Sequence, residues 1–133
     1  MDVNQARLVA FVAAGGAIGS VARYGLTGLL TTGDFPWGTF AVNLSGTFLL
    51  SVLFFYSVSR GNFPVDARVF LFTGIFGGYT TFSTFGLETV ALVRGGQIGL
   101  GAVNILLNGG VCLVGAFVGA AIGLWLGAVS VAA

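Results

Sequence analysis

One segment of the chain places hydroxyl, aromatic and glycine residues inside an otherwise apolar stretch. It reads Gly77-Gly78-Tyr79-Thr80-Thr81-Phe82-Ser83-Thr84-Phe85. Two adjacent glycines loosen a helix, and four hydroxyl groups follow within five positions. Backbone that leaves the helix at membrane depth is tolerated only where it is buried in protein or lines a wet cavity. The segment therefore predicts a site inside the membrane that handles an ion, rather than a drug site or a catalytic one.

Phe82 and Phe85 are the most informative pair within this segment. Two phenylalanines in a membrane helix are ordinarily core residues or lipid-facing ones, and that interpretation stays open here. These two, however, alternate with Thr81, Ser83 and Thr84, whose hydroxyls have no use against lipid. An aromatic ring has a negative face and a positive edge. Rings presented edge-on would attract an anion with the moderate strength that conduction requires.

Asn43 and Arg23 are the polar residues of the first two apolar stretches with the clearest functional interpretation. The amide of Asn43 could replace water around an anion, or could tie its helix to a neighbour. Arg23 lies seven residues before the end of its stretch at Leu30. Since a cation within the bilayer is costly, it should face protein or a vestibule, where it would concentrate anions. The alternative is that its side chain extends to the headgroups.

Two further groups of residues have both structural and functional interpretations. Glu88 shares a helix face with Thr81, Thr84 and Phe85. It could shape a vestibule or titrate during transport, but we expect it to pair structurally with an arginine or with backbone donors. Near the C-terminus, one helical stripe carries Asn104, Asn108 and Cys112 and then Gly115, Gly119, Gly123 and Gly127. Glycines four residues apart let helix backbones approach closely. The asparagines could either hold helices together or line a pore.

The composition identifies an integral membrane protein. The 133 residues are 56% hydrophobic and only 7% charged, whereas soluble domains carry about 25% charged residues. The chain has no histidine and one cysteine, which excludes an internal disulfide and metal chemistry based on His or Cys clusters. Neither paired carboxylates nor an activated nucleophile is present, so we expect no enzyme. A net charge of +1 argues against nucleic acid as a partner.

Four apolar stretches are long enough to span a bilayer, and they predict an all-α fold. They cover roughly residues 8–30, 40–58, 69–93 and 98–128. Short turn-forming segments connect them, so residues 1–133 form a single four-helix transmembrane domain. The third helix should be broken near Gly77-Thr80. We expect the first stretch to be retained as a span rather than removed as a signal peptide.

The arginines give little preference for one orientation in the membrane. Four spans place both termini on one side, with Arg7, Arg60 and Arg68. The other side has Arg94, together with Arg23 if it emerges there. Because an excess of arginine and lysine normally sets orientation, so small a difference is compatible with insertion both ways up. Two oppositely oriented copies could then form an antiparallel homodimer; insertion in a single orientation is the alternative.

Taken together, these residues resemble the Fluc family of fluoride channels. The resemblance extends from Gly15-Gly16-Ala17-Ile18-Gly19 with Arg23-Tyr24, through the segment from Trp37 to Gly46, to Gly77 through Phe85. The string from Thr80 to Phe85 is its most specific part. The resemblance implies an antiparallel dimer in the cell membrane that exports toxic fluoride passively through two separate pores. Its only partners would be fluoride, lipid and a second copy.

The resemblance also implies roles for individual residues. Phe82 and Phe85 would present their ring edges to fluoride, one ring from each subunit in each pore. Asn43 would hydrogen-bond the ion and Arg23 would lie at the vestibule. Thr81, Ser83 and Thr84 would form the hydroxyl-rich stretch beside the pore. Apart from the resemblance, we also include Asn108 among the candidate pore residues. A structural sodium ion at the dimer interface would be held by the backbone carbonyls of Gly77 and Thr80.

The chain departs from the family pattern at Gly86, where a serine is frequent, and at Asn104 and Asn108, where tyrosine or serine occurs. These departures concern conduction rate more than ion selectivity. Two other functions compete with the channel. One is a small dual-topology, proton-coupled exporter of cationic compounds, although such a transporter needs a carboxylate central in a span. The other is a non-transporting assembly subunit that docks through its glycines.

Overall fold

The computed structural model describes residues 2–61 and 63–132, with side chains to residue 130. Regular structure in these residues is entirely helical, as predicted. The first two helices are α1 (Val3–Leu30) and α2 (Trp37–Arg60). Asp2 caps α1: its carboxylate accepts a hydrogen bond from the Gln5 backbone at 2.7 Å, and the Gln5 side chain accepts one from the Asp2 backbone. Gly61 ends α2 with a φ of 69°, a conformation that favours glycine.

The third predicted span is divided into two helical segments. The first consists of α3 (Val65–Arg68), the π-helical segment η1 (Val69–Phe76) and α4 (Gly77–Tyr79), which follow one another without interruption. The second is α5 (Phe82–Arg94). Between them, Thr80 and Thr81 have extended backbone, with ψ angles of 156° and 116°. The predicted break near Gly77-Thr80 is therefore present.

The expectation that Gly77 and Gly78 themselves loosen the helix is wrong, because both are helical. At Gly78, glycine is required by the packing of α4 against α1 rather than by a break in the helix. A Cβ there would lie 2.6 Å from the carbonyl oxygen of Gly16 and 3.1 Å from its Cα, so glycine is needed for contact between α4 and α1. Gly15 and Gly19 of α1 are buried against η1 in the same manner. Close backbone approach of this kind is how small residues join helices in membranes.

The last helical stretch runs through α6 (Ile98–Ile105), the π-helical segment η2 (Leu106–Val111) and α7 (Cys112–Ala132). Three helical stretches of the described chain are long and apolar enough to cross a membrane: Val3–Leu30, Trp37–Arg60 and Ile98–Ser130. The predicted span 69–93 is not among them, because the break at Thr80 and Thr81 divides it into shorter helices.

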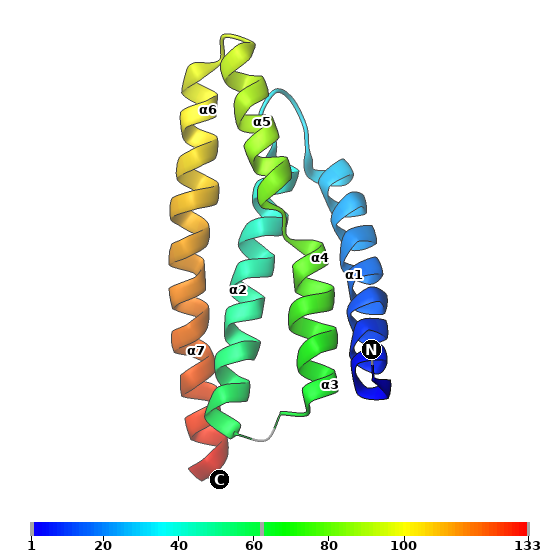
Figure 1. The fold of residues 1–133 in the computed structure, drawn as a ribbon. Helices are drawn as coiled ribbons and strands as arrows, with labels where there is room; N and C mark the ends of the chain where they lie inside the picture. The colour runs from blue at the N-terminus through cyan, green and yellow to red at the C-terminus, as the bar shows by residue number, and fades with distance from the viewer. Residues whose placement is uncertain (1, 62, 133) are drawn as a thin grey trace.

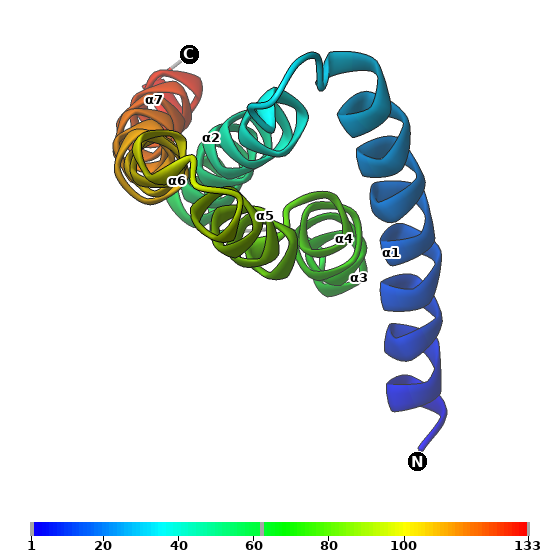
Figure 2. The same cartoon turned by 90° about the horizontal axis from the view of Figure 1, so that it is seen from above.

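The helices run up and down, and both ends of the chain lie at the same end of the molecule (Figure 1). Seen from above, α2, α5 and α6–α7 lie side by side, α4 lies next to α1, and α1 leans outward (Figure 2). Along α7, a Cβ added at Gly119 or Gly123 would collide with the backbone of α2 at Phe48 or Val52. Gly115 and Gly127 also face α2, so the prediction of close glycine packing is confirmed. We call these four glycines and their contacts on α2 the glycine seam.

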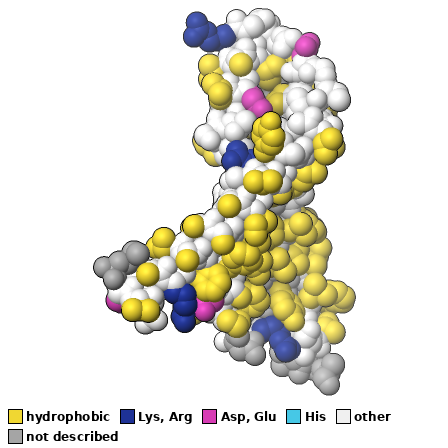
Figure 3. All heavy atoms as spheres, turned by 90° about the vertical axis from the view of Figure 1, so that its right-hand side faces the viewer, with side chains coloured by type: hydrophobic (Ala, Val, Ile, Leu, Met, Phe, Trp, Pro, Cys, Tyr) yellow, Lys and Arg dark blue, Asp and Glu magenta, His cyan; other side chains and the backbone are white. Residues whose placement is uncertain are grey.

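Polar side chains are among the most buried of the described residues, and large apolar side chains are among the most exposed. Thr39 and Asn104 are fully buried, and Asn43, Ser57 and Thr81 are buried almost as completely, whereas Phe117 and Trp125 are exposed. Hydrophobic side chains cover much of the lower half of the face drawn in Figure 3, and charged groups lie toward its two ends and also near its narrow middle. A soluble protein shows the opposite distribution. This surface suits a hydrocarbon environment, in which interior polar groups hold the helices together.

Candidate functional site at the helix break

The break in the third span is held by one side chain from α2. The Oδ1 atom of Asn43 accepts a hydrogen bond from the Thr81 backbone N–H at 2.7 Å, and its Nδ2 donates to the Thr81 carbonyl at 3.0 Å. The amide thus pairs with both backbone groups of one residue, as a neighbouring β-strand would. In a continuous α-helix the Thr81 N–H would bond to the carbonyl of Gly77. Asn43 therefore replaces a helical hydrogen bond and stabilises extended backbone at membrane depth.

Thr81 also caps the N-terminus of α5. Its side-chain oxygen accepts a hydrogen bond from the Thr84 backbone N–H at 3.2 Å, which is an N-cap. The same oxygen lies 3.0 Å from the Thr84 hydroxyl and 3.3 Å from the Ser83 hydroxyl. The three predicted hydroxyls are therefore brought together in one cluster at the start of α5. Since the Thr84 N–H is diverted to Thr81, it is not available to the carbonyl of Thr80.

A cavity of about 200 Å³ lies beside the two phenylalanines. The Phe82 and Phe85 rings meet edge to face, with centroids 5.3 Å apart and planes at 71°. Their cavity is also lined by Asn43, Thr47, Thr80, Thr81, Asn108 and Cys112. Thr47 and Cys112 were not predicted as site residues. Both could have been found by helical spacing, because Thr47 is four residues after Asn43 and Cys112 four after Asn108.

The asparagines of α6 and η2 extend the hydrogen bonding away from the break. The second N–H of Asn43 donates to Oδ1 of Asn108 at 2.8 Å. Asn108 donates in turn to Oδ1 of Asn104 at 2.8 Å, and Asn104 donates to the Thr89 hydroxyl at 2.9 Å. Thr89 donates to the carbonyl of Phe85 at 2.8 Å. Asn104, which the sequence left open as either a helix contact or a pore-lining residue, is thus fully buried within the network.

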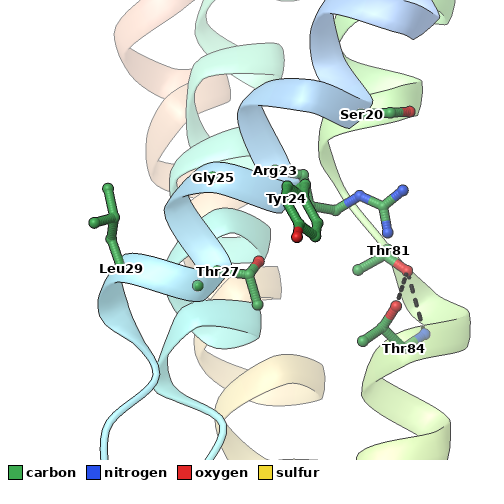
Figure 4. A pocket seen from close by; sticks show the side chains of 9 residues that line it. Ser20, Arg23, Tyr24, Gly25, Thr27, Leu29, Thr81 and Thr84 are labelled. Carbon is green, nitrogen blue, oxygen red and sulfur yellow. Dashed lines mark hydrogen bonds between the residues drawn. The ribbon is translucent and has the colours of Figure 1, made fainter.

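A larger cavity, of about 700 Å³, lies between α1 and the break. Ser20, Arg23 and Thr27 of α1 line it together with Thr81 and Thr84, and Figure 4 shows the Arg23 guanidinium extending toward the broken helix. The Nε atom of Arg23 donates to the Gly78 carbonyl at 3.1 Å. The side chain therefore lies at the C-terminal end of α4, where a cation is favoured by the helix dipole, rather than extending to the headgroups.

Glu88 has a different partner from the expected arginine or backbone donors. Its Oε1 accepts a hydrogen bond from the Thr39 hydroxyl of α2 at 2.7 Å. The buried Oε2 atom has no hydrogen-bond partner among the described residues. The sequence did not indicate this contact, because the two residues lie 49 positions apart on different helices. Glu88 lines a separate cavity with Thr31 and Asp34, toward the turns that follow α1 and α5.

These elements define a class: a small helical membrane protein with one interrupted span and a polar, aromatic-lined cavity at the interruption. A family model described as "CrcB-like protein, Camphor Resistance (CrcB)" matches residues 10–120. The chain belongs to this family.

Curated relatives agree over most of the chain. A protein of Agrobacterium fabrum (strain C58) is 46% identical over 118 residues, which cover 86% of this chain and 94% of the relative. One from Rhizobium meliloti is 43% identical, with 86% and 94% covered, and one from Rhodospirillum rubrum is 42% identical, with 82% and 88% covered. All three are named "Fluoride-specific ion channel FluC". The predicted resemblance is confirmed, and so is the prediction that the chain is not an enzyme.

Proposed function

We propose that the chain is a fluoride-selective channel that lets fluoride leave the cell passively through the cell membrane. The cavity beside Phe82 and Phe85 carries this proposal, because the two aromatic rings line it together with Asn43 at an interrupted helix. Fluoride is small and strongly hydrated, so a pore must replace its water with positively polarised groups. Aromatic edges and amide N–H groups supply such polarity without a fixed charge that would hold the ion.

The hydroxyl groups fit the same proposal. Thr81, Ser83 and Thr84 bond one another at the start of α5, so the hydroxyl hydrogens of Thr81 and Ser83 can have acceptors when no ion is present. Fluoride would compete with neutral oxygens for them, and this competition would keep binding moderate. Arg23 would act at a distance: on the wall of the larger cavity it raises the local concentration of anions.

Two antiparallel copies would complete the channel, with two pores and one ring from each copy in each pore. The surface of a single chain supports this. Phe82 is 83% exposed, and the cavity with the Arg23 guanidinium opens on the outside of α1 and α5. A cation and several hydroxyls facing acyl chains would be costly, so a second copy covering them is favourable. The arginine distribution supports insertion in both orientations only weakly. Arg23 lies at the break, so Arg94 alone balances Arg7, Arg60 and Arg68 on the side of the termini.

The carbonyls of Gly77 and Thr80 are suited to a structural sodium ion between the copies. The N–H groups that would bond to them in a continuous helix, those of Thr81 and Thr84, have other acceptors. Hard cations take oxygen ligands, and backbone carbonyls are among the oxygens they use. One pair of carbonyls from each copy would provide four ligands, and the bound ion would add positive potential between the pores.

Fluoride efflux from reconstituted liposomes tests the proposal. Vesicles loaded with potassium fluoride should release it when valinomycin is added, whereas vesicles loaded with potassium chloride should retain chloride. Phe82→Ile and Phe85→Ile should each lower fluoride flux at least tenfold, because an aliphatic side chain has no polarised edge. Phe117→Ile is the matched control: Phe117 is 71% exposed on α7, away from the cavity, and its replacement should leave flux unchanged.

Three results would refute the channel. Fluoride could remain trapped, a cationic dye could instead move with a proton gradient, or both ring variants could conduct normally. The second result would indicate the exporter. The residues that line the cavities at the break nonetheless include no carboxylate, and Glu88 lies in the separate one. For the dimer, reporters fused to the C-terminus should be found on both sides of the membrane. A reporter on one side only would contradict self-pairing in opposite orientations.

A further inference from the structure

A chain of hydrogen-bonded side-chain amides connects the helix break to the buried side of the fourth span. We call it the asparagine relay, and it consists of Asn43, Asn108 and Asn104. Each amide nitrogen donates to the oxygen of the next, at 2.8 Å in both steps. The last amide of the relay, that of Asn104, donates to the Thr89 hydroxyl, which in turn donates to the Phe85 carbonyl. The relay thus has a direction, with donors pointing away from the cavity and toward the buried helix interface.

Both N–H bonds of the Asn43 amide have acceptors in this arrangement. One donates to the Thr81 carbonyl and the other to Oδ1 of Asn108. Both asparagines line the cavity that Phe82 and Phe85 also line. An anion that enters can therefore bond to the Asn43 amide only by displacing one of the two acceptors. The Thr81 carbonyl belongs to the backbone that forms the break, whereas Asn108 presents a side chain that can turn about its χ angles.

The orientation of Asn108 is fixed from its other side. Its Nδ2 atom donates to Oδ1 of Asn104 at 2.8 Å and is 3.3 Å from the Asn104 carbonyl. With its nitrogen held there, its oxygen must face Asn43. Asn104 is fully buried and is bonded to Thr89, so it cannot turn to follow. Asn104 therefore holds Asn108 in the orientation in which it accepts from Asn43.

We propose that Asn108 is a positioning residue that occupies one N–H of Asn43 until fluoride takes it. The proposal rests on the channel function proposed above. Fluoride binding at Asn43 is then an exchange of acceptors. The free energy of the Asn43–Asn108 hydrogen bond is lost on binding, so fluoride binds more weakly than it would to a free amide. A net neutral hydrogen bond corresponds to roughly a fivefold factor in an equilibrium constant. The exchange also returns Asn43 to a satisfied state when the ion leaves, which favours rapid release.

The test is the dependence of flux on fluoride concentration in liposomes. Asn108→Leu keeps a similar volume and removes both the acceptor and the donor. It should lower the half-saturating fluoride concentration about fivefold, because Asn43 then binds the ion without exchange, and it should lower the maximal flux because release is slower. Damage to packing alone would lower the maximal flux and leave the half-saturating concentration unchanged. Leu106→Ala, at a lipid-facing position on the same helix (67% exposed), should change neither quantity.

Asn108→Ser gives a second reading in case the leucine variant does not fold. A serine hydroxyl is too short to reach Asn43 and Asn104 together, so the half-saturating concentration should fall in the same direction. Size-exclusion elution in detergent identifies the folded proteins. If wild type conducts fluoride and a folded variant has an unchanged or higher half-saturating concentration, the relay proposal is refuted while the channel stands. If wild type conducts no fluoride, both proposals fail together.

Discussion

The glycines of the glycine seam and two members of the asparagine relay, Asn104 and Asn108, belong to the same helical stretch, yet they join it to its neighbours by different chemistry. In the seam, the missing side chains of Gly119 and Gly123 bring α7 against the backbone of α2. In the relay, Asn104 and Asn108 fill the space between helices with hydrogen bonds. The seam is closely packed, whereas the relay borders a cavity of about 200 Å³.

Within this helical stretch, the glycines of the seam serve packing, whereas the asparagines of the relay belong to the proposed ion site. Neither region gains from the hydrophobic effect, because lipid tails are as apolar as the side chains they would replace. The seam depends on van der Waals contact, which is lost as soon as a larger atom intervenes. The relay depends on directional bonds whose partners can be exchanged. An ion site needs exchangeable partners, and it needs a rigid neighbour that keeps those partners in place.

The largest effect is expected from enlarging the seam. Gly123→Val should destabilise the protein by about 3 kcal/mol or more, because the added carbon meets the backbone of Val52 and Tyr56, which cannot turn aside. Thermal unfolding in detergent and the yield of monodisperse protein measure this. Gly99→Ala is the control, because nothing lies within 4 Å of a Cβ there and alanine is the better helix former. Equal stability of the two variants would remove the distinction between seam and surface.

A smaller loss is expected from breaking the buried end of the relay. Asn104→Leu leaves the second Asn108 hydrogen without its side-chain acceptor and removes the bond to Thr89, which should cost about 2 kcal/mol. Unlike the seam variant, it should also change the concentration dependence of flux, because Asn108 is no longer held. Unfolding and efflux measured on the same preparation test this pairing. A stability loss without any change in flux would make Asn104 purely structural.

The smallest effect is expected at the helix cap. Thr81→Val removes the oxygen that accepts from the Thr84 N–H and should cost about 1 kcal/mol, while the backbone bonds to Asn43 remain. Thr81→Ser keeps the oxygen and should restore the stability. Thermal unfolding of the two variants side by side measures the cap alone. If valine is as stable as serine, α5 does not depend on this cap.

Much of the fold could be predicted because hydropathy and turn residues are local properties. The spans and their short connections follow from runs of apolar residues bounded by glycine, proline and charge. The break in the third span was placed within two residues, from its hydroxyls and glycines. What stabilises the break was not predicted: the amide of Asn43, 38 positions from Thr81, holds the extended backbone. The role of Gly78 was not predicted either, because it permits contact with α1 rather than loosening the helix.

The site shows the same limit. Sequence identified Phe82, Phe85, Asn43 and Arg23 as special because polar and aromatic residues are out of place in an apolar run. It could not assign their partners. Arg23 donates to Gly78 and Glu88 accepts from Thr39, and both contacts join residues remote in the chain. The asparagines of the fourth span remained ambiguous between helix contact and pore lining until the relay placed Asn108 on the cavity and Asn104 behind it.

The sequence by itself determined that this is a helical membrane protein, and it identified the segment that contains the site. Each of these conclusions follows from the free energy of moving side chains and backbone groups between water and hydrocarbon. Only the tertiary structure decided which donor meets which acceptor. In hydrocarbon every buried polar group requires a partner, and that partner is chosen by how helices far apart in sequence come together.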